Sequence, residues 1–273
     1  MGQSNLSKKI QNNLLSDKDE ILKRYSDGDS YQLISEKYNC DKSLISNFVK
    51  QFVTFKRRNS KSKSKRKYTF KYDYFNKIDT KDKAYFLGLF YADGYNSGKT
   101  IRINLQQRDG SILEKFNYYV NNTRKLSLIR TKNGHSDLLL FEISSVHLCD
   151  KLTELGCPPK KSLILKFPTE EIVPKHLQNH FIRGYFDGDG CIHVVKYLNR
   201  VENRITILGT KDFLQGVSKV IFDNCNTNVK NILKQKNIFS LKYNGNLQTR
   251  RIYNYLYKDC EDLYLERKKE KFV

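Results

Sequence analysis

The chain has 273 residues, 38% of them hydrophobic, and 50 Lys and Arg against 29 Asp and Glu give it a formal net charge of +21. This length and hydrophobic content allow one large or two modest folded domains and exclude a disordered chain. The charge favours a polyanionic partner, of which nucleic acid is the commonest. A basic protein that binds no nucleic acid is the alternative.

No apolar run approaches the roughly 20 residues of a membrane span. The N-terminal segment MGQSNLSKKIQNN lacks the apolar stretch of a secretory signal. We therefore expect no membrane partner and a location inside the host cell, cytoplasmic or organellar, without secretion. The six cysteines show neither a CxxC pair nor a histidine at zinc-ligand spacing, so we expect reduced thiols.

Residues 1–53 are predicted to form a small helical domain, with three apolar-periodic stretches between residues 17 and 52. Asp41 is placed to cap the last helix. The side chains expected to face inward from that helix are Leu44, Ile45, Phe48 and Val49. Those expected on its outer face are Lys42, Ser43, Ser46, Asn47 and Lys50. Two helices joined by a tight turn, the second polar and basic outside, resemble a DNA-binding helix-turn-helix. The alternative is a small packing unit.

Residues 54–69 are predicted to be a basic linker. Its run KRRNSKSKSKRK, residues 56–67, holds eight Lys or Arg and no acid, so it cannot bury itself. Arg57 and Arg58 are candidates for phosphate or minor-groove contacts. A solvated tether is the alternative.

The rest of the chain reads as an internal duplication. In the first copy, residues 100–106 alternate as a half-buried strand, with Ile101, Ile103 and Leu105 inward. The elements expected in the first copy are helices at 79–92, 109–120 and 145–155 and strands at 100–106, 126–131 and 138–144. Those expected in the second are helices at 175–186, 212–222 and 247–257 and strands at 192–197, 204–208, 229–234 and 238–243. We predict an α+β fold of two αββαββα repeats, residues 70–168 and 169–273, whose antiparallel sheets each have one covered and one open face.

Each copy begins with a similar phrase, FLGLFYADG at 86–94 and IRGYFDGDG at 182–190. Each phrase places small residues four apart, Gly88 with Ala92 and Gly184 with Gly188. This spacing permits close approach of two helices. If the helices pack on these faces, Asp93 and Asp189 emerge side by side at the helix ends, with Gly94 and Gly190 terminating the helices.

Two acids at helix C-termini are electrostatically unfavourable, because the terminal carbonyls already carry partial negative charge. The arrangement becomes favourable around a hard divalent cation bound by carboxylate and carbonyl oxygens. Such a site in a basic protein suits phosphodiester hydrolysis. For one copy alone, a turn after a buried helix would be the better interpretation; the matching second copy favours a site.

The two phrases resemble the paired motifs of LAGLIDADG homing endonucleases, in the form that carries both motifs on one chain, and the resemblance covers residues 70–273. It implies a monomer with two saddle-shaped sheets lying in the DNA major groove. It also implies Mg²⁺ or Mn²⁺ held by Asp93 and Asp189 with the carbonyls of Ala92 and Gly188. The sixth motif position departs from symmetry, being Tyr91 in one copy and Asp187 in the other.

Other roles carry over from the resemblance. Gln107 would order water near the metals in the first half. The equivalent position in the second half is Gly209. Lys161 and Lys268 would stabilise charge on the cleaved phosphate; simple phosphate contact or a solvated surface charge is the alternative for each. The sheet residues expected to read base edges are Arg102, Asn104, Arg204, Thr206 and Lys242.

The sequence thus predicts a site-specific double-strand DNA endonuclease with an appended helix-turn-helix. A non-catalytic DNA-binding regulator of the same fold is less favoured, because such a protein would be expected to lose a motif aspartate. An RNA maturase acting on intron RNA stays open, because basic sheets can also bind RNA.

Overall fold

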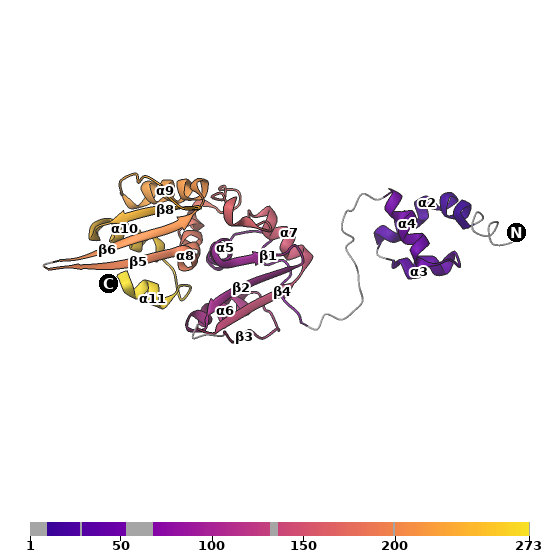
Figure 1. Ribbon diagram of the computed structural model, residues 1–273, viewed down its shortest axis with the longest axis horizontal. Coiled ribbons are helices and arrows are strands. Elements are labelled where there is room, and N and C mark those ends of the chain that lie inside the picture. The colour runs from indigo at the N-terminus through magenta and orange to yellow at the C-terminus, as the bar shows by residue number, and fades with distance from the viewer. Residues whose placement is uncertain (1–9, 28, 53–67, 132–135, 199, 273) are drawn as a thin grey trace. The chain divides into compact units, whose positions relative to one another are not determined.

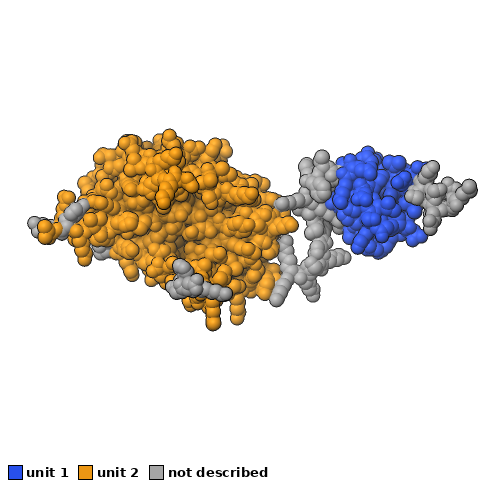
Figure 2. All heavy atoms as spheres, in the orientation of Figure 1, with its two compact units in different colours: residues 1–66 blue, residues 67–273 orange. Residues whose placement is uncertain are grey.

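The computed structural model describes residues 10–27, 29–52, 68–131, 136–198 and 200–272. The chain divides into two compact units, residues 1–66 and 67–273 (Figure 2). The basic run at 56–67, with Arg57 and Arg58, lies outside the described residues. Among the described residues, no helix is both long enough and apolar enough to cross a membrane.

In the first unit, helices α2 (Lys18–Asp27), α3 (Tyr31–Lys37) and α4 (Lys42–Phe52) pack around a small apolar core. Asp41 caps α4 as predicted, its Oδ1 accepting from the Ser43 N–H at 2.7 Å. The prediction that Leu44 faces inward is wrong, because its side chain is 39% exposed. Leu44 lies about 100° around the helix from the buried Ile45, at the edge of the apolar stripe.

The second unit contains the predicted duplication, and its α+β class is confirmed (Figure 1). The first copy comprises α5 (Lys81–Asp93), β1 (Gly94–Asn96), β2 (Thr100–Gln106), α6 (Gly110–Tyr119), β3 (Ser127–Ile129), β4 (Leu138–Ser144) and α7 (Val146–Glu154). The second comprises α8 (Gln178–Asp189), β5 (Gly190–Tyr197), β6 (Arg200–Gly209), α9 (Lys211–Cys225), β7 (Leu233–Gln235), β8 (Ile238–Asn244) and α10 (Asn246–Leu256), followed by α11 (Glu266–Lys269). The sheets have matching orders, β1-β2-β4-β3 and β5-β6-β8-β7, and every pairing in them is antiparallel.

Four elements differ most from the sequence prediction, and one of them is β6, which begins at Arg200, four residues before its predicted start. Strand β1 has only three residues, too few to show an alternating pattern, and was not predicted. The short helix α11 was not predicted either. Strand β7 begins at Leu233, four residues after the predicted start, and all three of its residues are exposed.

Each sheet buries one face under helices and leaves the other open. In the first copy, Ile101 pairs with Ile143 and Ile103 with Phe141, and these buried residues form part of the core with α6 and α7. In the second copy, the covered face includes the pair Ile207 and Leu241 beneath α9 and α10. Because side chains alternate along a strand, the intervening residues project from the open faces.

Helices α5 and α8 pack along each other at the junction of the two copies. A Cβ added to Gly88 would lie 2.0 Å from the carbonyl oxygen of Phe181, and one added to Gly184 would lie 2.0 Å from that of Tyr85. The two contacts are reciprocal, since each glycine faces the residue three positions before the other. The predicted close approach through small residues is confirmed.

Candidate functional site

The C-terminal ends of α5 and α8 bring Asp93 against the backbone of the opposite helix. A Cβ on Gly188 would lie 2.7 Å from Asp93 Oδ2 and 2.3 Å from Ala92 Cβ. The missing side chain at position 188, one residue before Asp189, therefore makes room for the Asp93 carboxylate. The structure brings together the four residues proposed from sequence to hold a metal: Ala92, Asp93, Gly188 and Asp189.

Gly94 and Gly190 follow the two aspartates for a steric reason. Both have extended backbones, with φ of −73° and −93°, so neither supplies the left-handed conformation common after a helix. A Cβ would instead lie 2.4 Å from the carbonyl oxygen of Phe90 at position 94, and 2.5 Å from that of Phe186 at position 190. Both glycines let the chain leave the helix directly into the first strand of its sheet.

The two carboxylates lie in an environment that disfavours their charge. Asp93 keeps exposed surface and Asp189 is half-buried, but partial desolvation by the packed helix ends, reinforced by repulsion from Asp189, raises the pKa of Asp93 to about 6. Burial also raises the pKa of Asp189, while the positive charge of Lys161 opposes the shift. The folded chain thus holds two acidic groups where a bound cation would relieve their desolvation and repulsion.

The donor set fits a hard cation that keeps part of its water shell. Within the described ranges, no group of three or more His, Cys, Asp and Glu side chains could hold a metal. Two carboxylates and two main-chain carbonyls leave coordination positions for water and for substrate phosphate oxygens. That is how Mg²⁺ is usually bound by proteins, whereas structural zinc takes four Cys or His ligands.

Two buried lysines from other segments contact the C-terminal ends of α5 and α8, beside the aspartates. Lys161 Nζ donates to the Ala92 carbonyl at 3.1 Å. Lys268 Nζ contacts four carbonyls, those of Phe186 at 2.8 Å, Asp187 at 2.5 Å, Gly188 at 3.1 Å and Gly190 at 2.7 Å. They are 6% and 5% exposed, so the alternative of a solvated surface charge does not hold for either. Each ammonium group compensates the negative end of a helix dipole, a role that the sequence reasoning missed.

The sixth motif position is structural in both copies. Tyr91 Oη donates to the Leu155 carbonyl at 2.6 Å. Asp187 Oδ2 accepts from Tyr85 Oη at 2.7 Å and from the Leu265 N–H at 2.9 Å. Burial raises the pKa of Asp187 to about 6. Asp187 therefore joins α8 to α5 and to the C-terminal segment.

Residues 261–268, which we call the C-terminal strap, tie the end of the second copy to the first. Arg267 forms a two-pronged ion pair with the buried Asp109, with Nε to Oδ1 and Nη2 to Oδ2 both at 2.8 Å. Two exposed ion pairs add to it, Lys115 with Asp262 at 3.1 Å and Lys81 with Glu261 at 3.2 Å. The strap carries Lys268, so these contacts fix the lysine that holds the end of α8.

Substituting Arg267 by alanine is expected to lower the free energy of unfolding by about 2 kcal/mol, because it leaves the Asp109 carboxylate buried without its cation. A double-mutant cycle with Asp109→Asn should return a coupling free energy above about 1 kcal/mol, measured by urea unfolding. The matched control is Lys81→Ala. Its exposed pair with Glu261 should contribute less than about 0.5 kcal/mol. Equal losses at the two sites would show that the strap pair has no special role.

The predicted base-reading residues lie on the open sheet faces. Asn104 is exposed on β2, while Arg204, Thr206 and Lys242 are half-buried on β6 and β8. Arg102 forms an ion pair with Glu142, which also accepts from Arg124, and Arg204 pairs with Glu202 at 3.2 Å. The sequence reasoning did not identify these acids, although Glu142 alternates outward in β4.

Two other groups of predicted residues, Gln107 and the outer face of α4, form no hydrogen bond or ion pair with the aspartates among the described residues. Gln107 begins the turn after β2, with an exposed side chain, and its N–H donates to the Asp137 carbonyl at 2.9 Å. On α4, Lys42, Ser43, Asn47 and Lys50 are exposed, and Ser46 is half-buried. The polar outer face of α4 is thus present, on the separate N-terminal unit.

Comparison with known proteins locates the fold. No protein-family model matches the sequence. The probable translation initiation factor IF-2 of Methanocaldococcus jannaschii is 30% identical over 138 residues, which are 49% of this chain and span only 11% of that protein. The homing endonuclease I-WcaI bound to its DNA recognition sequence is 12% identical, with 74% of this chain and 91% of that chain covered and a TM-score of 0.52. The LAGLIDADG homing endonuclease I-GzeII in complex with its DNA target is 13% identical over 69% of this chain and 87% of that chain, with a TM-score of 0.48.

Proposed function

We propose that this chain, which has the fold of LAGLIDADG homing endonucleases, is a site-specific double-strand DNA endonuclease that requires Mg²⁺ or Mn²⁺. The observation that carries the proposal is the meeting of α5 and α8 at Asp93 and Asp189, two neighbouring acids with raised pKa values. The net charge of +21 supports a polyanionic substrate. The likeness to I-WcaI, a homing endonuclease bound to its DNA recognition sequence, supports duplex DNA as that substrate.

The residues of the site divide the chemical work. Asp93 and Asp189, with the carbonyls of Ala92 and Gly188, would hold the cation, which supplies Lewis-acid activation of the phosphate and of the attacking water. Lys161 and Lys268 keep the two helix ends in place through their carbonyl contacts. Their positive charge also lies beside the position where phosphate charge would develop, and it stabilises that charge in a buried setting.

The open sheet faces would read the DNA sequence. The Arg102–Glu142 and Arg204–Glu202 pairs restrict the orientation of each guanidinium group. An oriented arginine can donate two parallel hydrogen bonds to guanine in the major groove. Asn104, Thr206 and Lys242 add donors and acceptors to the same faces. Specificity would then come from both copies, over a long site.

The test is selection of cleaved molecules from a randomised duplex DNA library, with the full chain in Mg²⁺ and in EDTA. The proposal expects one enriched long sequence, cut on both strands only when the metal is present. Enrichment that is identical in EDTA would contradict the metal assignment. Tight binding to intron-like RNA without any DNA cutting would support the maturase alternative instead.

The N-terminal unit is proposed to add affinity through α4. Deleting residues 1–67 is expected to weaken duplex binding by about tenfold or more at low salt and to flatten its salt dependence, because phosphate contacts are lost. Fluorescence anisotropy over a salt series measures both effects. The shortened chain should keep the thermal stability of the second unit, since the units are separately compact. An unchanged affinity would show that this unit does not bind DNA.

A further inference from the structure

A pocket of about 740 Å³ lies among the ends of α8, α9 and α10, outside the site described above. None of the described residues that line it belongs to a strand, so it is not part of the open sheet faces. We call it the flank pocket. It is lined by Lys175, His176, Asn179, His180, Asn224, Cys225, Asn226, Arg251, Asn254, Tyr255, Lys258 and Asp259.

The flank pocket has a cationic rim. Lys175 and Lys258 are exposed, and Arg251 is half-buried. Arg251 is held in place by donating from Nη1 to the Asn226 carbonyl at 2.6 Å, while Lys175 also meets Glu170 at 3.4 Å in an exposed and therefore weak pair. Among the described lining residues, Asp259 is the only acid. The rim therefore favours an anion.

The lining also contains buried polar side chains with fixed hydrogen-bonding roles. Asn179, 7% exposed, donates from Nδ2 to the carbonyls of Tyr255 and Lys258, both at 3.3 Å. The buried Arg183 donates from Nη1 to His180 Nδ1 at 2.9 Å. Because arginine can only donate, the proton of the neutral imidazole must lie on Nε2. Burial, with the Arg183 charge, lowers the pKa of His180 to about 3, so the ring stays neutral.

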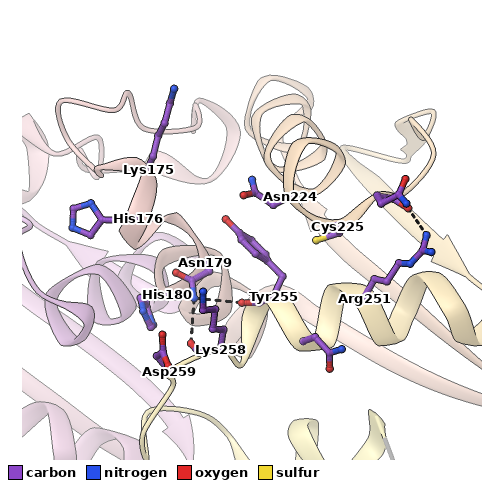
Figure 3. Close-up of a pocket in the computed structure, with 12 residues that line it drawn as sticks. Lys175, His176, Asn179, His180, Asn224, Cys225, Arg251, Tyr255, Lys258 and Asp259 are labelled. Carbon is purple, nitrogen blue, oxygen red and sulfur yellow. Dashed lines mark hydrogen bonds between the residues drawn. The ribbon is translucent and has the colours of Figure 1, made fainter.

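Figure 3 shows how these groups surround the hollow. Lys175, His176 and Asn179 lie on one side, Cys225 and Arg251 on the other, and the Tyr255 ring projects between them. A half-buried aromatic ring beside amide groups suits an unpaired base, which is recognised by stacking and edge hydrogen bonds. Cations at the rim suit the phosphate of the same nucleotide.

We propose that the flank pocket binds one phosphate-bearing nucleotide, presented either as a free nucleotide or as an unpaired nucleotide of an RNA strand. An unpaired base is typical of RNA loops and ends, whereas duplex DNA keeps its bases stacked. The site is independent of cleavage: Asn179 lies ten residues before Asp189 on α8, about 15 Å along the helix. Duplex on the open sheet faces and a nucleotide in this pocket can therefore be bound together.

The first test uses the full chain and a mixed-sequence single-stranded RNA that contains photoreactive 4-thiouridine, with crosslinks mapped by mass spectrometry. We expect crosslinks to peptides that carry His176 and Tyr255. The double variant Lys175→Glu, Lys258→Glu should reduce them by about tenfold or more, because both changes remove phosphate contacts. The matched control is Lys211→Glu, Lys219→Glu, which alters the same net charge outside the pocket and should change the yield by less than about twofold.

A second arm titrates inorganic phosphate and mixed ribonucleoside 5′-monophosphates by calorimetry. Monophosphate binding that the rim variant abolishes identifies a free-nucleotide pocket, and crosslinking without monophosphate binding identifies an RNA strand; both support the proposal. Crosslinks confined to the sheet faces, or an equal loss in the control, overturn it. The rim variant should cut DNA at the wild-type rate, so this proposal and the nuclease proposal can fail separately.

Discussion

Replacing Asp189 by asparagine is expected to lower the DNA cleavage rate by about a thousandfold or more and to leave duplex binding intact. Asparagine keeps the shape of the side chain but removes the negative charge that would hold the cation. The same loss is expected for Asp93→Asn, because the two carboxylates occupy equivalent ends of α5 and α8. Single-turnover cleavage in Mg²⁺ and anisotropy in Ca²⁺ measure the two properties separately.

The stability of these variants gives a second readout. Burial raises the pKa of both carboxylates, so their ionised forms cost folding free energy. A neutral asparagine removes that cost, and the unfolding temperature should stay level or rise. The control is Asp212→Asn, at an exposed carboxylate in the first turn of α9, which should affect neither cleavage nor binding. Wild-type cutting by both motif variants would remove the catalytic assignment.

Gly184→Ala should have the largest effect on stability, a loss of at least about 3 kcal/mol of unfolding free energy. The new methyl group would lie 2.0 Å from the Tyr85 carbonyl oxygen and 2.9 Å from the Leu89 nitrogen. These are backbone atoms of α5, so no side-chain rotation can relieve the overlap and the helices must separate. Gly88→Ala should cause a similar loss of stability, because its methyl group would overlap the Phe181 carbonyl oxygen. Chemical unfolding of the full chain, followed by circular dichroism, measures the loss.

Gly110→Ala is the matched control for the helical glycines. Its methyl group would meet only Leu139 Cδ1 closely, at 2.2 Å, and that atom ends a flexible side chain. Alanine also favours a helix over glycine by about 0.5–1 kcal/mol. We therefore expect a change within about 1 kcal/mol of zero. A loss at Gly184 no larger than that at Gly110 would contradict the close packing of α5 on α8.

The sequence by itself determined the repeat architecture and the position of the acids. Period-two alternation in residues 100–106 predicted the bounds of β2, because half-burial is encoded locally along a strand. The four-residue spacing of Gly88 with Ala92 and of Gly184 with Gly188 predicted which faces of α5 and α8 meet. Both signals are local in the sequence, so they can be recognised without knowledge of the rest of the fold.

Only the tertiary structure decided what surrounds the two acids. Lys268 reaches the Gly188 carbonyl from 80 positions away, and Arg267 reaches Asp109 across 158 positions. Asp187 accepts hydrogen bonds from Tyr85 and Leu265, partners that its motif position did not predict. The flank pocket likewise joins the ends of α8, α9 and α10. Such contacts depend on how segments distant in the sequence pack together. Local sequence periodicity does not predict that packing.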